Sequence, residues 1–312
     1  MIIWYLFPIE KTKISHFMPD NAISFVSFNI NKKEPFIKNA IQNVKTKIIN
    51  EKTGFLKTQV INLGINMAMP KQVLLITSYD EKIKNTDSVI IINFGRLTKL
   101  LKIFSQSLDS QLFNSGFAVK KIKNHKIKYA LKPLKLDVKS INLIEMKHSY
   151  TIVNNNLLIG SSFKILQNTL WNYLNNQANK QELDNITSMI MPGASEKSGM
   201  VFLDNTKNHL SVLYKNIEEY VAFAAFPSIV STNIILGKIW FEEQDIQLNF
   251  EFIARDSDKM SDIRSDVKFF YGAMKRVLKP RNIDLEYDIK IQENSLFFNC
   301  RIINLLTGIL EN

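Results

Sequence analysis

The stretch IDLEYDIKIQENSLFFNCRII, residues 283–303, carries the clearest structural signal in the chain. Apolar and polar side chains alternate on both sides of Glu293 and Asn294, a pair suited to a turn. In a strand, successive side chains point to opposite faces, so this alternation places one residue in two on a buried face. The stretch therefore predicts a β-hairpin with one face toward a core and the other toward solvent.

The same order of elements is predicted twice when the chain is followed outward from this hairpin. A strand, a helix, a hairpin, a second helix and a second hairpin run over residues 22–131 and return over residues 200–304. An extra hairpin and helix at 143–174 separate the two copies. The predicted fold class is α+β, with antiparallel sheets, helices on one face, and two similar halves (β-α-ββ-α-ββ repeated). Only element order supports the repeat, because the copies share no convincing residue-level identity.

The chain organisation follows from these elements and from a polar stretch broken by Pro192 and Gly193. Predicted helices span about 97–113 and 207–226, and a third is capped by Ser257 or Asp258. The predicted divisions are 1–18 as the end of a membrane anchor or a tail, 19–178 as the first half, 179–199 as a linker, and 200–312 as the second half.

The composition is that of an ordinary globular protein. The 312 residues are 46% hydrophobic and 22% charged, enough apolar material for a sizeable core and about two domains. The single cysteine, Cys300, excludes an internal disulfide and a multi-cysteine zinc site. Because Cys300 alternates with Phe298 and Ile302, we expect it to be a buried, small apolar residue.

Positive charge is concentrated in the first half of the sequence. Residues 1–150 hold 24 basic against 10 acidic residues, a net charge of +14 within a total of +11. Such asymmetry is typical of a nucleic-acid or anionic-membrane surface. However, 34 of the 40 basic residues are lysine, and lysine excess beside abundant asparagine and isoleucine also fits the coding bias of an AT-rich genome. The second explanation is the simpler one.

The N-terminal apolar run offers two interpretations. It is too short to cross a bilayer, which takes about 20 residues. Trp4 and Tyr5 beside a charged segment resemble the aromatic belt of an anchor, so the run is either the outer end of a membrane anchor or an apolar tail packed on the protein. The candidate anchor residues are Ile2, Ile3, Trp4, Tyr5, Leu6 and Phe7.

The sequence contains no persuasive catalytic or metal-binding constellation. Ser161 and Lys164 fit the SxxK pattern of penicillin-binding serine acyltransferases, but the lysine-serine-glycine triplet at 197–199 follows too soon and no Ser-x-Asn lies between. The four histidines are scattered, and the aspartates between 256 and 266 lack the glycine and glutamate of a calcium loop. We therefore expect no enzyme, no cofactor and no metal.

A lysine-rich hairpin at 117–131 is the candidate binding site. Solvated protection of a sheet edge is the simpler explanation of its lysines, and contact with anionic lipid headgroups is the functional alternative. Nucleic acid is disfavoured because Tyr129 is the one aromatic residue between Lys120 and Lys139. The candidate contacts are Lys120, Lys121, Lys123, Lys126 and Lys128.

Two segments resemble an uncharacterised family of bacterial cell-envelope proteins with an N-terminal anchor. HFMPDNAISFVSFNI, residues 16–30, is similar to the start of the mature region of that family, and SYTIVNNNLLIGSSFKILQNTLWNYL, residues 149–174, is similar to its repeated strand-turn-strand-helix unit. The resemblance implies an α+β fold and the cell envelope, and it supplies no catalytic residue. The apolar run at residues 1–7 is shorter than the anchor of that pattern, and we expect it to be either the outer end of an anchor or a tail.

The expected function is therefore that of a non-enzymatic protein on the periplasmic side of the cytoplasmic membrane. It would bind a protein partner, or an apolar or lipid ligand between helix layer and sheet, with its N-terminus at the membrane. The alternative is a cytoplasmic protein that binds nucleic acid or another anionic surface through its lysine-rich first half.

Overall fold

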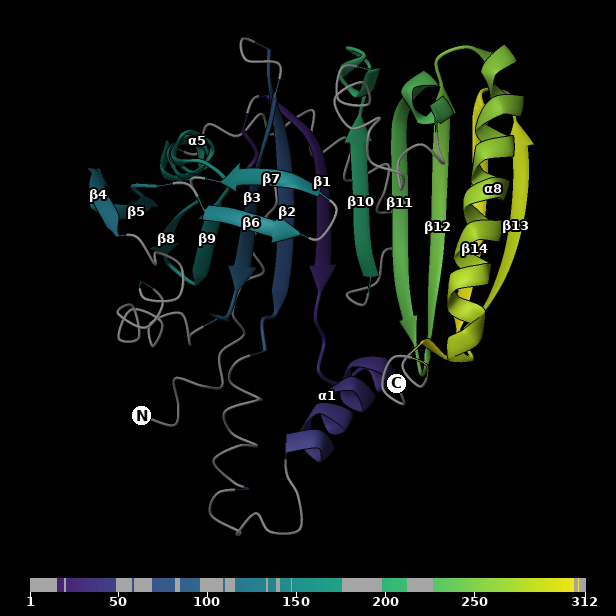
Figure 1. Ribbon diagram of the computed structural model, residues 1–312, viewed down its shortest axis with the longest axis horizontal. Coiled ribbons are helices and arrows are strands. Elements are labelled where there is room, and N and C mark those ends of the chain that lie inside the picture. The colour runs from purple at the N-terminus through teal and green to yellow at the C-terminus, as the bar shows by residue number, and fades with distance from the viewer. Residues whose placement is uncertain are drawn as a thin grey trace. The chain divides into compact units, whose positions relative to one another are not determined.

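The computed structural model describes residues 16–19, 21–48, 58, 69–81, 85–95, 109, 116–132, 134–138, 141–146, 148–175, 198–211, 227–305 and 308. The chain forms two compact units, and each contains segments that are distant in sequence (Figure 1). Unit 1 comprises residues 1–22, 67–80 and 86–186, and unit 2 comprises residues 23–66, 81–85 and 187–312.

Unit 2 contains an antiparallel sheet in the strand order β13-β14-β12-β11-β10-β1. Its two long hairpins are those that strict alternation predicts, and β1 joins them from the start of the chain by pairing with β10. The bounds are β1 Ala22–Asn29, β10 Ser198–Asp204, β11 Thr232–Glu242, β12 Asp245–Ala254, β13 Asp284–Gln292 and β14 Ser295–Ile303.

Helix α8, Met260–Leu278, covers one face of this sheet. Ile263, which is fully buried, and Val267 belong to a core with Leu285, Leu296 and Phe298 from the closing hairpin. Burial of apolar area at about 25 cal/mol per Å² is the main term that holds the helix on the strands. A second helix, α1, spans Pro35–Ile48, and Phe36 within it packs on Phe241 of β11 with ring centroids 5.1 Å apart.

Unit 1 contains a sheet in the strand order β2-β3-β9-β8-β5-β4, with helix α5, Phe163–Asn175, on one face. Leu166 and Leu170 of α5 are fully buried, as the predicted helical stripe requires. The strand bounds are β2 Gln72–Asp80, β3 Asn85–Asn93, β4 Phe117–Ile122, β5 His125–Ala130, β8 Ser149–Val153 and β9 Asn156–Gly160.

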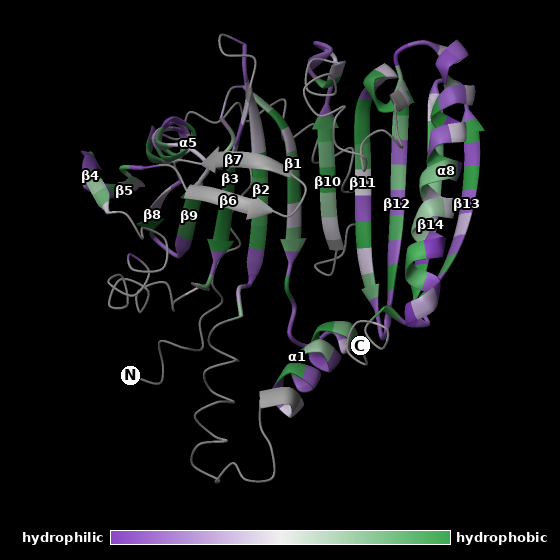
Figure 2. Cartoon of the chain, viewed as in Figure 1, coloured by the Kyte–Doolittle hydropathy of each residue, from purple (hydrophilic) through white to green (hydrophobic). Residues whose placement is uncertain are grey.

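Figure 2 shows the hydrophobic residues concentrated along the strands of both sheets. A small separate sheet pairs β6, Leu134–Val138, with β7, Ile141–Met146. The sequence analysis did not predict this hairpin. It also placed the α8 cap at Ser257 or Asp258, which is wrong, because a 3-10 turn, Ser257–Lys259, precedes the helix and Lys259 is the capping position, without a side-chain cap.

The structure confirms an α+β protein of antiparallel sheets and a few helices. It does not establish the predicted repeat, because most of the predicted helices 97–113 and 207–226 lie outside the described residues. The repeat stays a prediction. The predicted linker, 179–199, also lies almost wholly outside the described part of the chain.

Candidate functional site

The lysine-rich segment forms the edge hairpin β4–β5 of unit 1, and its lysines are divided between two faces. Ile122 and Ile127 are buried on the face that α5 covers, and the exposed Lys120 belongs to the same face. Tyr129 also belongs to this face, and its ring lies 5.0 Å from that of Phe163 at the start of α5. Lys121, Lys126 and Lys128 alternate with these residues and so belong to the opposite face. The candidate lysines therefore form a basic rim that extends around an edge strand.

The tip of the hairpin brings like charges together. Lys121 lies directly opposite Lys126 in the strand register, and Lys123 occupies the turn between them with a φ of 50°. All three side chains are exposed. No carboxylate within the described residues pairs with any of these three ammonium groups. Like charges placed directly across two strands destabilise the pairing, so the tip concentrates positive charge at a cost to the fold.

Aromatic side chains from α5 lie beside the lysines. The Nζ atom of Lys120 is 5.1 Å from the ring centroid of Phe163, and that of Lys123 is 5.3 Å from the ring of Trp171. Both distances fall within the range of cation–π attraction. Trp171 is 46% exposed, and Lys123 also donates a hydrogen bond to Asn175 at the end of α5. The sequence analysis missed these aromatics because they are about 40–50 residues away from the lysines along the chain.

Lys128 differs from the other four lysines. Its Nζ atom binds the Asp109 carboxylate at 2.6 Å, and the hydroxyl of Tyr150 donates to the same carboxylate at 2.5 Å. Burial, together with this hydrogen bond, raises the pKa of Tyr150 well above its ordinary value. Lys128 therefore neutralises an internal carboxylate. We define the basic hairpin surface as Lys120, Lys121, Lys123, Lys126 and Trp171, without Lys128.

The other part of the predicted membrane contact is not described. The candidate anchor residues Ile2, Ile3, Trp4, Tyr5, Leu6 and Phe7 lie outside the described residues. Within the part of the chain that is described, no helix combines the length and the apolar character needed to span a bilayer.

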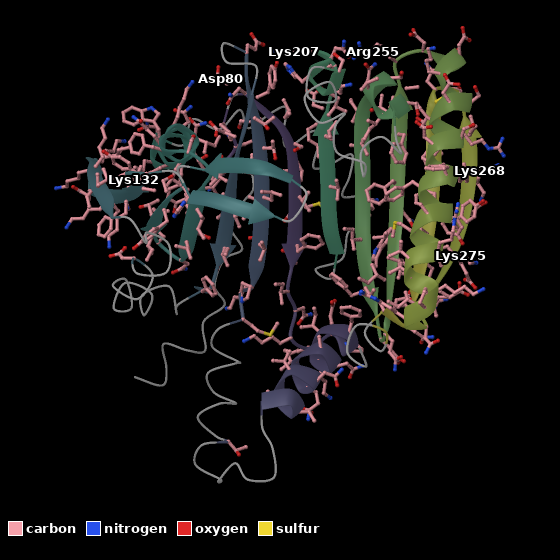
Figure 3. All side chains as sticks on the ribbon, viewed as in Figure 1. Asp80, Lys132, Lys207, Arg255, Lys268 and Lys275 are labelled. Carbon is pink, nitrogen blue, oxygen red and sulfur yellow. The ribbon has the colours of Figure 1, made fainter. Side chains whose placement is uncertain are left out.

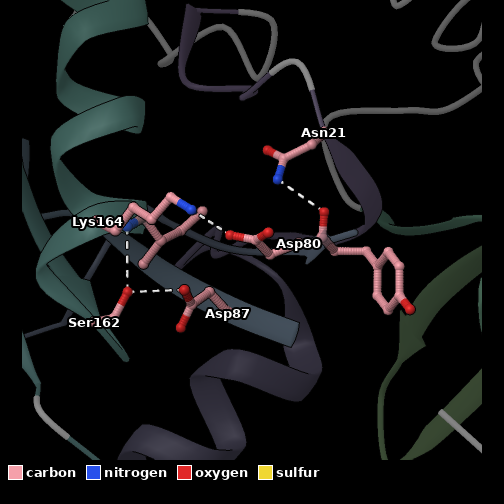
Figure 4. Close-up of polar contacts among 7 residues, drawn as sticks. Asn21, Asp80, Asp87, Ser162 and Lys164 are labelled. Carbon is pink, nitrogen blue, oxygen red and sulfur yellow. Dashed lines mark hydrogen bonds and ion pairs between the residues drawn. The ribbon is translucent and has the colours of Figure 1, made fainter. Parts of the chain in front are cut away.

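The Ser161-to-Lys164 motif connects strands to the start of α5 (Figure 4). The Asp87 carboxylate at the start of β3 accepts hydrogen bonds from the hydroxyls of Ser161 and Ser162, each at 2.9 Å. The Ser162 hydroxyl oxygen also accepts from the backbone N–H of Ile165 at 3.3 Å, which satisfies one free donor of the first helical turn. Asp87 thus ties the end of β9 and the helix N-terminus to β3.

The surroundings of Lys164 do not suit a general base that would activate a serine. Its ammonium pairs with Asp80, and the hydrogen bond to that carboxylate, followed by its charge, raises the pKa of Lys164 above its ordinary value. A lysine acting as general base requires the opposite shift, toward neutral pH. The geometry gives these residues a structural role at the helix start.

The remaining chemically notable side chains also have packing roles. Cys300 is 7% exposed in the α8 core, and burial raises the pKa of its thiol to about 11. Asp266 on α8 accepts hydrogen bonds from the backbone N–H and hydroxyl of Ser228, at 2.7 and 2.5 Å. Within the described residues, no three histidine, cysteine or acidic side chains converge as metal ligands would.

Two open hollows, of about 220 and 320 Å³, lie on the sheet of unit 2. Their lining includes Asn249, Glu251, Phe297 and Asn299, which alternate along β12 and β14 with the residues that α8 covers. These hollows therefore open mainly away from α8. A ligand site between helix layer and sheet stays a prediction.

No family model and no curated protein matches the chain. The comparison with solved structures finds a distant similarity to TP0453. Crystal form III is 12% identical over 97% of this chain and 99% of that chain, with a TM-score of 0.46. Crystal form I is 10% identical over 96% of both chains, with a TM-score of 0.45, and crystal form IV is 8% identical over 98% of both, with a TM-score of 0.44. The proposals below depend on the chain's own residues.

Proposed function

We propose that this chain is a non-enzymatic protein of the bacterial cell envelope that binds an anionic lipid surface through its basic hairpin surface. The resemblance of residues 16–30 and 149–174 to envelope proteins supports the compartment. The geometry of β4–β5 supports the ligand class.

The observation that carries the proposal is the direct pairing of Lys121 with Lys126, with Lys123 in the turn between them. Three ammonium groups held together by the backbone register repel one another unless an anion is bound. Each lysine near an anionic membrane surface contributes about 1 kcal/mol to binding, so a cluster of this size supports measurable attachment.

Trp171 supports a lipid rather than a soluble anion. A half-exposed indole has an apolar body and a polar N–H, and such rings favour the headgroup layer of a bilayer. Lys123 lies over this ring, so the turn of the hairpin and Trp171 would reach a membrane together. Val119, 50% exposed on the same edge strand, adds apolar area.

Flotation with vesicles tests the proposal. Protein is mixed with vesicles of phosphatidylcholine alone or with phosphatidylglycerol, at low and high salt. We expect binding only to the anionic vesicles, weakened by salt because the charges are exposed. The triple variant Lys121→Gln, Lys123→Gln, Lys126→Gln should bind at least about tenfold more weakly, as the loss of three such charges predicts.

A matched control removes the same charge elsewhere. The triple variant Lys33→Gln, Lys38→Gln, Lys71→Gln changes three exposed lysines that are not part of the hairpin and should bind nearly as the parent does. Equal loss in both triple variants would mean that net charge alone acts, and the proposal would be wrong. Tighter, salt-dependent binding to a single-stranded oligonucleotide than to the anionic vesicles would also overturn it in favour of nucleic acid.

A further inference from the structure

The outer side of α8 in unit 2 carries apolar side chains that the fold leaves uncovered. Phe269 is 58% exposed, Phe270 is 44% exposed and Val277 is 69% exposed, while Ile263 and Val267 on the inner side are buried. Phe269 and Val277 are eight residues apart with Ala273 midway, a spacing that aligns them on one stripe. The helix thus has two apolar stripes, and packing on the sheet uses one of them.

The C-terminal half of the outer stripe lies among basic residues, whereas Asp262 and Asp266 lie one to two turns before Phe269 on the same helix. From residue 267 to residue 283 the chain contains no acidic residue. Figure 3 labels Lys268 and Lys275, which project from α8. The basic residues of this segment are Lys268, Lys275, Arg276, Lys279 and Arg281.

Little of this charge is neutralised within the described residues. The Nζ atom of Lys275 lies 3.5 Å from the Asp284 carboxylate, and the two side chains are 45% and 63% exposed. Arg276 donates to the carbonyl of Gly272, one turn earlier in the same helix. A methyl group added at Gly272 would meet nothing within 4 Å, so the space next to the outer stripe is open among the residues that the structure describes.

The charge decides between the partners that could cover this stripe. A second copy packed in parallel would place the five cations of residues 267–283 against the same five cations, which like-charge repulsion opposes. Exposed phenylalanine and valine beside lysine and arginine is the composition of helices that lie in the interface of an anionic bilayer. Apolar side chains then enter the acyl boundary while the basic side chains reach the phosphates.

We propose that the outer face of α8 is a second lipid contact, at which Phe269 and Val277 enter an anionic bilayer surface and the basic residues of 268–281 bind its headgroups. This contact involves residues of unit 2 alone and does not depend on the basic hairpin surface of unit 1. The α8 contact and the basic hairpin surface should respond differently to salt. Salt weakens ion pairing, but it leaves in place the burial of apolar area that the α8 contact adds.

A variant pair tests the contact. Phe269→Ser with Val277→Ser should lower the partition of the full chain onto phosphatidylglycerol-containing vesicles by about tenfold or more at high salt, as the loss of two inserted side chains predicts. The matched control, Val44→Ser with Ile90→Ser, changes two exposed apolar residues elsewhere and should bind as the parent does. Because the substituted positions are exposed, circular dichroism and thermal unfolding should show intact folds.

A fluorescent probe on α8 reports directly whether its outer face contacts the bilayer. An environment-sensitive dye on Phe269→Cys, in a Cys300→Ala background, should shift to the blue with anionic vesicles, and the same dye on Gln292→Cys, an exposed edge position, should not. No shift at position 269, or unchanged high-salt binding of the Phe269 and Val277 variant, would overturn the contact even if the hairpin triple variant loses binding. A concentration-dependent dimer that the same variant abolishes would instead identify an interface between copies.

Discussion

The two edge hairpins, β4–β5 in unit 1 and β13–β14 in unit 2, are built alike. Each ends a sheet, each has a helix on one face, and each turns through a residue with a φ of 50°, Lys123 in one and Glu293 in the other. They differ in the charges that face each other across the strands.

In β13–β14 the facing charges are opposite, and in β4–β5 they are alike. Glu286 lies opposite Arg301, whose guanidinium also binds Asp245 at 2.8 Å. Lys121 lies opposite Lys126. Charges of opposite sign across a strand pair support the fold, and charges of like sign oppose it. The facing charges of β13–β14 therefore stabilise the fold. Those of β4–β5 destabilise it, as the proposed binding of an anionic surface would explain.

The largest expected effect concerns the helices that cover both hairpins. Leu166→Ala in α5 and Ile263→Ala in α8 each remove a fully buried side chain, so each should lower the free energy of unfolding by about 2–5 kcal/mol. Urea unfolding measures both. If one variant unfolded as the parent does, the two helices would not be equivalent supports of their sheets.

A comparable but smaller loss of folding stability is expected in unit 2 when the pH is raised. The buried Cys300 thiol has a pKa near 11, above its ordinary value of 9.0, so folding favours the protonated form. This stability is complete below pH 9 and is lost as the pH rises from 9 to 11, because the unfolded chain releases its proton first. The stability of Cys300→Ala should fall less steeply over this range, and identical slopes would show that the thiol is solvated.

Each unit ties a helix to a neighbouring segment with one aspartate. Asp87→Ala removes the acceptor of the Ser161 and Ser162 hydroxyls, and Asp266→Ala removes that of Ser228. Loss of hydrogen bonds to a charged acceptor should cost about 1–3 kcal/mol in each case by thermal or urea unfolding. Asp87→Asn, which keeps an acceptor oxygen, should recover part of the loss.

The smallest effect tests the comparison most directly. Lys121→Glu replaces the facing like charges of β4–β5 by opposite charges, so it should raise the stability by about 0.2–1 kcal/mol. Glu286→Lys should act in the reverse direction on β13–β14. Calorimetry measures both, and vesicle flotation should show that the stabilised Lys121→Glu variant binds anionic lipid more weakly. A variant that is less stable and binds equally well would remove the distinction between the hairpins.

The sequence predicted those parts of the fold that depend on local periodicity. Alternation identified β13–β14 and the β11–β12 hairpin, and the apolar stripe through Leu166 and Leu170 identified α5. The β6–β7 hairpin was missed, because nothing in its local pattern distinguished it from the lysine-rich stretch beside it.

The candidate site could be predicted only in part. The lysines of 120–126 were visible because they are neighbours in the chain. The position of Trp171 beside Lys123, and of Asp87 beside Ser161, depends on strand order, which local spacing does not encode. The exposure of Phe269 was hidden for a related reason, since a helix with two apolar stripes does not reveal which one packs on the sheet.

The pairing of β1 with β10 has a consequence for synthesis on the ribosome. Phe28 and its partner Gly199 are separated by 171 positions. At about 5–20 residues per second, the nascent chain carries β1 for roughly 10–35 seconds before the strand that completes this ladder exists. During that interval AISFVSFN offers an apolar ribbon to whatever is nearby, so a chaperone that occupies it until residue 204 emerges should raise the yield of native protein.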